Sequence, residues 1–308
     1  MSNPDVKPKK TPRQKAFAVL PTLLTLGNAV CGFGAITILA RVGPNFDIAP
    51  GSAGGYDPAL EMVNAAKLIF LAMLFDALDG SAARLTNQTS EFGAMLDSLC
   101  DVVSFGVAPA FMMLKLTDPR QRLMETLQTK GDAAPTMERM FTAPFDYPIE
   151  VLWPIAALFL ACAILRLARF NVETDEEDDH GGFSGLPSPA AAAVIASFPI
   201  GVDSLTRKAW AEPAGEIILP ALAVLLPLIT LATAVLMVSR IRYPHIFNQM
   251  LRGSQGRQQL LQLVFTLALL SAIGGMTIPV IFCWFAFAGP CQAVWRKYGK
   301  PVFQKSAA

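Results

Sequence analysis

Long apolar segments separated by short polar stretches run through almost the whole chain of 308 residues. Each is long enough, or nearly so, to cross a bilayer as a helix of about 20 residues. The segments lie near residues 16–40, 62–83, 94–114, 149–168, 187–204, 216–239, 258–274 and 276–294. The last two can also be read as one longer element, because Gly274, Gly275 and Pro279 suit either a tight turn or a broken helix. The pattern predicts an all-α polytopic membrane protein, a helical bundle of six to eight transmembrane helices.

The composition supports one membrane-embedded bundle. Hydrophobic residues make up 53% of the chain and charged residues 16%, so little sequence remains for a separate soluble domain. We expect a basic cytoplasmic tail at residues 1–15, a single transmembrane domain at residues 16–295 and a second cytoplasmic tail at residues 296–308. The net charge of +1 carries no information about nucleic acid, but the chain has no basic, aromatic patch, so we expect no nucleic-acid partner.

The distribution of lysine and arginine predicts the orientation of the bundle. With a cytoplasmic N-terminus, 16 of the 25 basic residues fall on the cytoplasmic side. An excess of these residues marks the cytoplasmic side of a membrane protein. We therefore expect a protein of the bacterial inner membrane in which the turn at residues 85–92 faces the cytoplasm.

Four aspartates interrupt the apolar pattern on either side of this turn. Asp76 and Asp79 are three residues apart and Asp97 and Asp101 are four apart, so each pair projects from one face of its helix. The short turn makes the two helices antiparallel neighbours, so the carboxylates converge near the cytoplasmic boundary. Such a group needs neutralisation in a medium of low dielectric constant. Oxygen ligands without His or Cys favour two divalent cations, Mg²⁺ or Mn²⁺, over zinc.

The surroundings of the aspartates suit phosphoryl transfer. Two metal ions neutralise phosphate oxygens and hold the attacking and leaving oxygens in line. Gly80, Ala83 and Gly93 leave the helix faces open for a bulky substrate, and Arg84 adds a cation suited to a diphosphate. Two other interpretations stay open at this point. The small residues can serve tight helix packing, and the aspartates can form the cation relay of a transporter.

The aspartate motif resembles a known family signature. At all eight defining positions the chain matches the pattern of the CDP-alcohol phosphotransferases: Asp76-x2-Asp79-Gly80-x2-Ala83-Arg84-x8-Gly93-x3-Asp97-x3-Asp101. The resemblance implies an integral membrane enzyme that displaces CMP from a CDP-linked substrate with an alcohol and uses two divalent metals.

Position by position, the resemblance implies a role for each signature residue. Asp76, Asp79 and Asp97 would be metal ligands, with Asp97 bridging the two metals. Asp101 would contact the second metal and act as the catalytic base. The nucleotide and diphosphate of CDP-diacylglycerol would be bordered by Gly80, Ala83 and Arg84, and Ser90 in the same turn is a candidate contact for the CDP moiety.

Further stretches are similar to the membrane-type phosphatidylserine synthases. They lie at residues 20–33, 97–110, 166–171 and 183–189. The similarity implies transfer of the phosphatidyl group of CDP-diacylglycerol to L-serine, by a homodimer embedded in membrane lipid. Related enzymes that use glycerol 3-phosphate or an inositol phosphate are the alternative. A phosphate dianion, however, requires a denser cationic pocket than Arg166 and Arg169 offer.

Polar residues outside the motif are candidates for substrate contacts. Arg166 and Arg169 lie at the predicted cytoplasmic end of the fourth segment, where a guanidinium can bind the serine carboxylate bidentately. Anchoring by the positive-inside rule is the alternative for both. Thr25 and Asn28 on the first helix are candidates either for nucleotide contacts or for hydrogen bonds between helices.

Overall fold

The chain forms a bundle of long helices. The computed structural model describes residues 12–42, 58–85, 91–117, 148–173, 183–206, 212–243 and 274–298. The helical elements are α1 (Pro12–Arg41), α2 (Pro58–Leu85), α3 (Glu91–Asp101), η1 (Val102–Val107), α4 (Ala108–Thr117), α7 (Ile149–Glu173), α8 (Ser188–Thr206), α9 (Glu212–Val238), η5 (Gly274–Met276) and α12 (Thr277–Tyr298). Within these ranges the extended structure is one antiparallel pair of two-residue strands, β1 (Phe183–Ser184) and β2 (Arg242–Tyr243). The all-α prediction is confirmed, whereas residues 258–273 of the seventh predicted span lie outside the described residues.

Several of the helices suit a membrane. Three stretches in the described residues are long and apolar enough to cross it, at Leu20–Arg41, Glu91–Thr117 and Ile149–Val172. Two shorter apolar stretches lie at Val224–Val238 and Thr277–Pro290. In hydrocarbon every backbone N–H and C=O needs an internal partner, which a helix supplies within one segment. The protein is thus a helical membrane protein, as the hydropathy pattern predicted.

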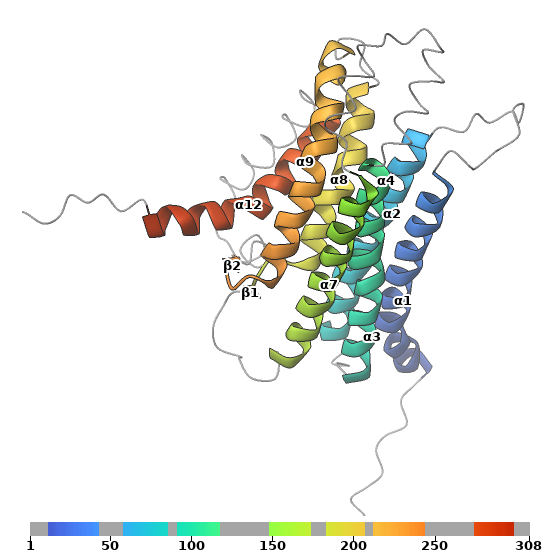
Figure 1. Ribbon diagram of the computed structural model, residues 1–308. Helices are drawn as coiled ribbons and strands as arrows, with labels where there is room; N and C mark the ends of the chain where they lie inside the picture. The colour runs from blue at the N-terminus through green and yellow to red at the C-terminus, as the bar shows by residue number, and fades with distance from the viewer. Residues whose placement is uncertain are drawn as a thin grey trace, which may run out of the picture.

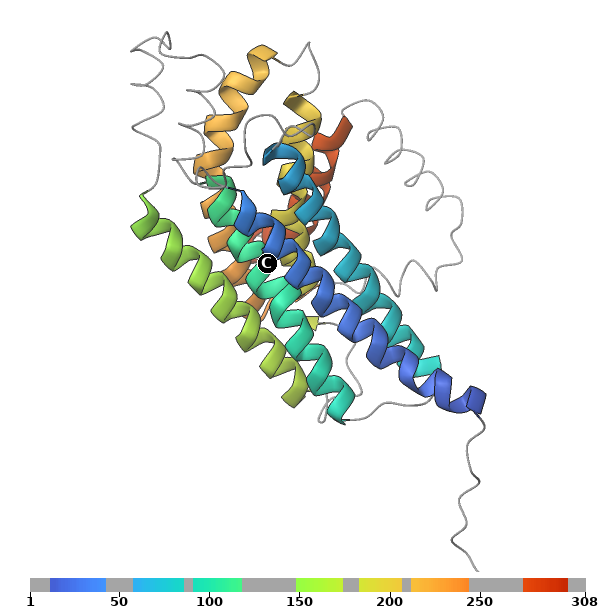
Figure 2. The same ribbon diagram turned by 90° about the vertical axis from the view of Figure 1, so that its right-hand side faces the viewer.

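In chain order, the described helices from α1 to α9 run in alternating directions, counting α3, η1 and α4 as one continuous rod (Figures 1 and 2). Helix α1 packs along α2, α7 packs against α9, and α8 packs against both α2 and α12. The alanines at positions 191, 192, 193 and 196 of α8 are buried, and such small side chains let neighbouring helices approach closely. One end of the bundle therefore gathers the beginnings of α1, α3 and α8 and the ends of α2, α7 and α9.

A wide π-helical turn, η1, interrupts the rod formed by α3 and α4. It follows Asp101 directly, and the N–H of Ala108 bonds to the carbonyl of Val103, five residues earlier. Pro109 comes next, and in a regular α-helix its ring would clash with the carbonyl four residues before it. Phe105, the residue four positions before Pro109, lies within the wider turn. Turns of this kind occur frequently at functional sites.

A tight turn between α7 and α8 packs against the end of α9. Gly185 has a positive φ of 85°, a conformation in which a side chain is disfavoured. Its N–H donates to the carbonyl of Ile241 at 2.9 Å, and the N–H of Leu186 donates to the carbonyl of Leu236 at 3.0 Å. A Cβ at Gly185 would lie 3.0 Å from the carbonyl oxygen of Ser239. These contacts fix the place where α8 begins.

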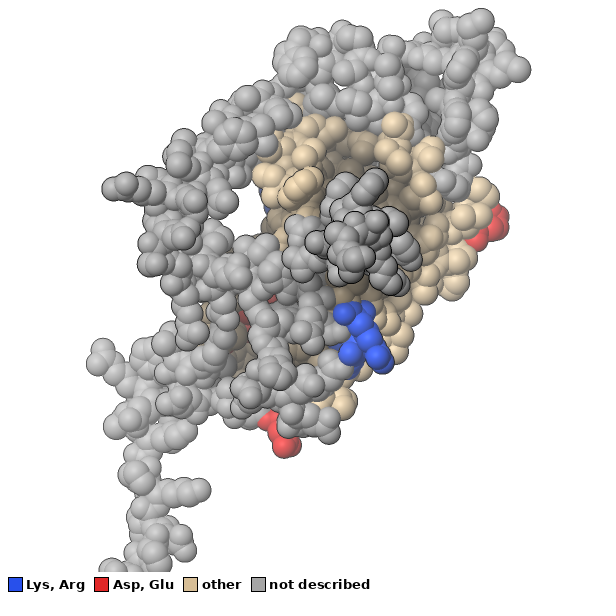
Figure 3. Space-filling model, turned by 90° about the vertical axis from the view of Figure 1, so that its left-hand side faces the viewer, with Lys and Arg blue, Asp and Glu red and all other residues tan. Residues whose placement is uncertain are grey.

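The exterior of the described bundle is mostly uncharged. On the face shown in Figure 3, the described residues present few Lys, Arg, Asp or Glu side chains. Large apolar side chains are exposed on several helices, including Val30 and Phe33 of α1, Trp153 of α7 and Trp284 of α12. Because soluble monomers rarely expose extended apolar surface, this exterior suits contact with lipid hydrocarbon.

Candidate active site

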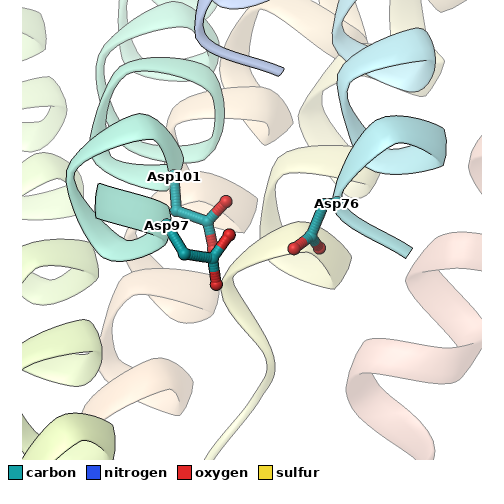
Figure 4. Close-up of side chains that lie close together, drawn as sticks. All are labelled: Asp76, Asp97 and Asp101. Atoms are coloured by element: carbon teal, nitrogen blue, oxygen red, sulfur yellow. The ribbon is translucent and has the colours of Figure 1, made fainter. Parts of the chain in front are cut away.

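Three carboxylates from two helices meet at one end of the bundle. Asp76 of α2 faces Asp97 and Asp101 of α3 (Figure 4). Each contributes one oxygen to a group in which all three oxygens lie within 4.8 Å of one another. Asp101 is buried, and Asp76 and Asp97 are half-buried. The structure therefore brings together three of the four aspartates of the motif.

Asp79, the fourth aspartate, lies outside this group of three. It is located almost one turn beyond Asp76 on α2 and is buried, with Thr25 of α1 beside its carboxylate. The Thr25 hydroxyl donates to the carbonyl of Pro21 at 3.0 Å. The charge of Asp79 also acts on Asp97. Asp79 thus belongs to the same electrostatic cluster, at the side that faces α1.

The cluster is compatible with divalent cations. Asp79 Oδ2 and Asp97 Oδ1 are buried and have no hydrogen-bond partner among the described residues. Carboxylates this close repel one another, and the repulsion is poorly screened away from water. Carboxylate oxygens without His or Cys are the donors that Mg²⁺ and Mn²⁺ prefer. Unpaired oxygens and concentrated negative charge therefore favour a cation at this place.

Helix α1 contacts the rod of α3 and η1 at two levels. Asn28 is fully buried and donates from Nδ2 to Asp101 Oδ1 at 2.8 Å. The hydroxyl of Ser104 in η1 donates to the backbone carbonyl of Asn28 at 2.9 Å. Four residues further along α1, a Cβ at Gly32 would lie 2.7 Å from the Cα of Ser104. The two backbones are in contact there, so any side chain at position 32 would push them apart.

Arg166 of α7 approaches the same carboxylates. Its Nη1 donates at 3.1 Å to the hydroxyl of Ser188, the first residue of α8. Its Nε is buried and has no partner in the part of the chain that the structure describes. The charges of Asp101 and Asp76 act on its guanidinium. Arg169, one turn further along α7, is half-buried.

A second polar pair ties α3 to α7. The hydroxyl of Ser98 donates to Asn171 Oδ1 at 3.1 Å, and Asn171 Nδ2 donates to Ser98 Oγ at 3.0 Å. Ser98 directly follows Asp97 in sequence. The pair therefore fixes the segment that carries two of the three clustered carboxylates.

The other residues of the predicted substrate site are described to different extents. Gly80 is exposed, and a Cβ there would meet nothing within 4 Å, so the space beside it is open. Ala83 and Arg84 belong to the end of α2, but their side chains are outside the described part of the structure. Ser90 also lies outside the described residues.

Four polar residues around the site have no role predicted from the sequence. Ser104 bonds to Asn28 and Ser188 bonds to Arg166, whereas Ser98 and Asn171 bond to each other. All four lie in the stretches that carried the family resemblance. For Ser98 and Ser104, the nearby carboxylates of Asp97 and Asp101 in an apolar helix are the signal that could have found them. The partners of all four could not be read from the chain, because the bonded residues are 73, 76 and 22 positions apart.

Comparison with known proteins places this site in a family. The family model described as CDP-alcohol phosphatidyltransferase matches residues 18–236, which include the four aspartates, Asn28 and Arg166. The chain belongs to the CDP-alcohol phosphatidyltransferase family. The matched range runs from α1 into α9, so the described helices that build the aspartate cluster lie within it and α12 lies beyond it.

Similar proteins occur in bacteria and archaea. The chain is 32% identical over 190 residues to CDP-diacylglycerol--serine O-phosphatidyltransferase of Helicobacter pylori strain ATCC 700392 / 26695, covering 62% of this chain and 64% of that protein. It is 33% identical over 237 residues to archaetidylserine synthase of Methanothermobacter thermautotrophicus, covering 75% and 72%. It is 28% identical over 226 residues to the CDP-diacylglycerol--serine O-phosphatidyltransferase of Bacillus subtilis strain 168, covering 73% and 90%. The chain thus spans slightly less than two thirds of the Helicobacter protein.

Proposed function

We propose that this CDP-alcohol phosphatidyltransferase transfers the phosphatidyl group of CDP-diacylglycerol to L-serine, giving phosphatidylserine and CMP. The observation that carries the proposal is the group of three carboxylates from α2 and α3 in a chain of this family. The names of the relatives support serine as the acceptor, since two are CDP-diacylglycerol--serine O-phosphatidyltransferases and one is an archaetidylserine synthase. Membership of a transferase family favours this reaction over the transporter alternative.

The four aspartates would hold the metal. Asp76, Asp79, Asp97 and Asp101 are proposed to bind two divalent cations, Mg²⁺ or Mn²⁺, with Asp97 shared between them. When bound, such cations neutralise the diphosphate and favour an in-line displacement. The unpaired oxygens of Asp79 and Asp97 support this assignment.

Asp101 is the proposed base. Its carboxylate takes the proton of the serine hydroxyl while the hydroxyl oxygen forms a bond to the phosphorus that carries diacylglycerol. The bond from that phosphorus to the CMP oxygen breaks, and CMP leaves with the electron pair. Because Asn28 occupies Oδ1 of Asp101, the other carboxylate oxygen is available for this proton. One displacement completes the reaction without a covalent enzyme intermediate.

Different residues around the cluster are proposed to bind each substrate. The open space beside Gly80 supports a nucleotide next to the end of α2, with the acyl chains among the apolar helices. The residues proposed to border the nucleotide and diphosphate are Gly80, Ala83, Arg84, Ser90 and Thr25. The predicted contact of Asn28 with the nucleotide stays a prediction. Arg166 and Arg169 are proposed to bind the serine carboxylate, and the position of Arg166 beside Asp76 and Asp101 supports its share of this role.

We further propose a bacterial inner-membrane location with the site facing the cytoplasm. Helix α1 begins at the same end of the bundle as the aspartate cluster, and the excess of basic residues supports a cytoplasmic N-terminus (Figure 1). Residues 16–295 would form one phosphotransferase domain between two short cytoplasmic tails, although α1 itself begins at Pro12 and α12 ends at Tyr298. The family resemblance supports a homodimer embedded in membrane lipid.

The proposed reaction predicts which acceptor releases CMP. Purified protein in detergent with CDP-diacylglycerol should release CMP when L-serine and either Mg²⁺ or Mn²⁺ are present together, and EDTA should stop the release. Glycerol 3-phosphate and inositol phosphate, tested at the same concentrations, serve as matched acceptors. Release with one of these and not with serine would refute the serine assignment and keep the aspartate site. No release with any acceptor would refute the transferase proposal for this chain.

The arginine beside the cluster gives a second prediction. Arg166→Lys should raise the KM for L-serine about ten- to a hundredfold, because lysine keeps the charge but loses the bidentate geometry. The KM for CDP-diacylglycerol should change little. Steady-state CMP release measured against each substrate separates the two constants.

Arg240 offers a matched control for this change. It is an exposed arginine just after the end of α9, so Arg240→Lys should leave both KM values near those of the wild type. An Arg166→Lys variant with an unchanged KM for serine and a higher KM for CDP-diacylglycerol would instead assign Arg166 to the diphosphate.

A further inference from the structure

The amide of Asn28 has an unusual environment for a polar group in an apolar helix. It is fully buried and 2.8 Å from the carboxylate of Asp101. The NH₂ of the amide faces the carboxylate, and both oxygens of an ionised carboxylate are acceptors. Asn28 Oδ1 has no partner among the described residues, so within them the bond to Asp101 is the contact that orients this amide.

The backbone of Asn28 is also held in place. Ser104 in the π-helical turn donates to its carbonyl at 2.9 Å. Because Gly32 lacks a side chain, α1 approaches the backbone of Ser104 closely. Asp101 comes immediately before this turn. The backbone of Asn28 therefore fixes the position of α1 along η1, and the side chain of Asn28 fixes the carboxylate of Asp101.

We propose that Asn28 is a positioning residue, which orients Asp101 so that one carboxylate oxygen is occupied by the amide and the other is directed to the cation and the acceptor hydroxyl. Ser104 and Gly32 set the register in which Asn28 can do this. This role of Asn28 rests on the proposed function, in which Asp101 accepts the proton of the serine hydroxyl. It differs from the nucleotide contact predicted for Asn28 from the sequence.

The proposal is tested with Asn28→Ala and Ser104→Ala in the full-length protein, purified in detergent. The affinity for Mn²⁺ is measured by electron paramagnetic resonance without substrates, and CMP release gives kcat and both KM values. Asn28→Ala should weaken Mn²⁺ binding about tenfold and lower kcat about ten- to a hundredfold, the range for groups that orient metal ligands. The KM for CDP-diacylglycerol should stay within about twofold of the wild type. Ser104→Ala should also weaken Mn²⁺ binding and lower kcat, each by about two- to tenfold.

Thr37→Ala is the matched control on the same helix. Thr37 is half-buried, and its hydroxyl bonds within α1, to the carbonyl of Phe33 at 2.9 Å. It lies nine residues from Asn28, or about 13 Å along the helix. This change should leave Mn²⁺ affinity and kcat unaltered. A thermal unfolding midpoint of Asn28→Ala close to that of Thr37→Ala shows that the lost activity does not come from unfolding.

Two results would overturn the proposal. A raised KM for CDP-diacylglycerol with unchanged kcat and Mn²⁺ affinity would assign Asn28 to the nucleotide. Unchanged kinetics and Mn²⁺ affinity would leave the bond as a packing contact only. If the wild-type protein releases no CMP with serine, the proposed function fails, while the Mn²⁺ measurement still tests whether Asn28 orients Asp101.

Discussion

Asp101→Asn should lower the rate of CMP release at least about a thousandfold and leave the protein folded. General-base catalysis alone contributes about 10²- to 10⁴-fold, and asparagine can neither take the proton nor neutralise a cation. The fold should survive because the new amide oxygen can still accept the hydrogen bond from Asn28 Nδ2, which now joins α1 to Asp101 at 2.8 Å. The rate of CMP release with serine and the thermal unfolding midpoint measure the two effects.

Asp203→Asn is the matched control for this variant. Asp203 is half-buried on α8, 15 residues after Ser188 and therefore about 22 Å along the helix from the contact with Arg166. This change should leave turnover close to the wild-type rate. Turnover of Asp101→Asn within about tenfold of the wild type would contradict the assignment of Asp101 as the base.

The convergence of the aspartates could be predicted because it depends on local helix geometry. Spacings of three and four residues place Asp76 and Asp79, and Asp97 and Asp101, on one face of their helices. A short turn then makes the two helices neighbours. The same reasoning could not separate Asp79 from the group of three, because its position depends on α1, whose Thr25 lies beside it.

The supporting contacts could not be predicted, because they depend on packing between distant segments. Pro109 indicates a disturbance of the third helix but does not specify a π-helical turn. Gly32 looks like any small residue in an apolar helix until the structure brings Ser104 against it. The hydropathy pattern located each of the long described helices within a few residues. The pairing of Asn28 with Asp101 and of Arg166 with Ser188, however, required the assembled bundle.

Different helices carry the carboxylates of the site and hold them in position. Helices α2 and α3 carry the carboxylates, as the motif predicted. Helix α1 holds Asp101 through Asn28, and α7 is joined to α3 through the bonded pair of Ser98 and Asn171. The turn at Gly185 sets the start of α8, where Ser188 binds Arg166. Elements far apart in the sequence thus fix the carboxylates from several sides.

Asp97→Asn should have opposite effects on stability and on activity. Removing one of three carboxylates within 4.8 Å of one another relieves repulsion, so the variant should unfold at a higher temperature than the wild type in EDTA. At a Mn²⁺ concentration of about 100 times Kd, binding stabilises the folded protein by about 2.7 kcal/mol. The variant should lose most of this stabilisation. CMP release should fall about a thousandfold, the equivalent of about 4 kcal/mol of lost charge stabilisation.

Thermal unfolding of both proteins with EDTA and with Mn²⁺ separates these effects, and Glu91→Gln is the matched control. Glu91 is an exposed acid in the first turn of the same helix, so its replacement should preserve the stabilisation by Mn²⁺. If Asp97→Asn kept the full stabilisation by Mn²⁺, the cation would have to bind elsewhere. If the variant were less stable than the wild type in EDTA, the carboxylates would not repel one another in the cation-free protein. Both results together would mean that the unpaired oxygen of Asp97 is not a cation ligand.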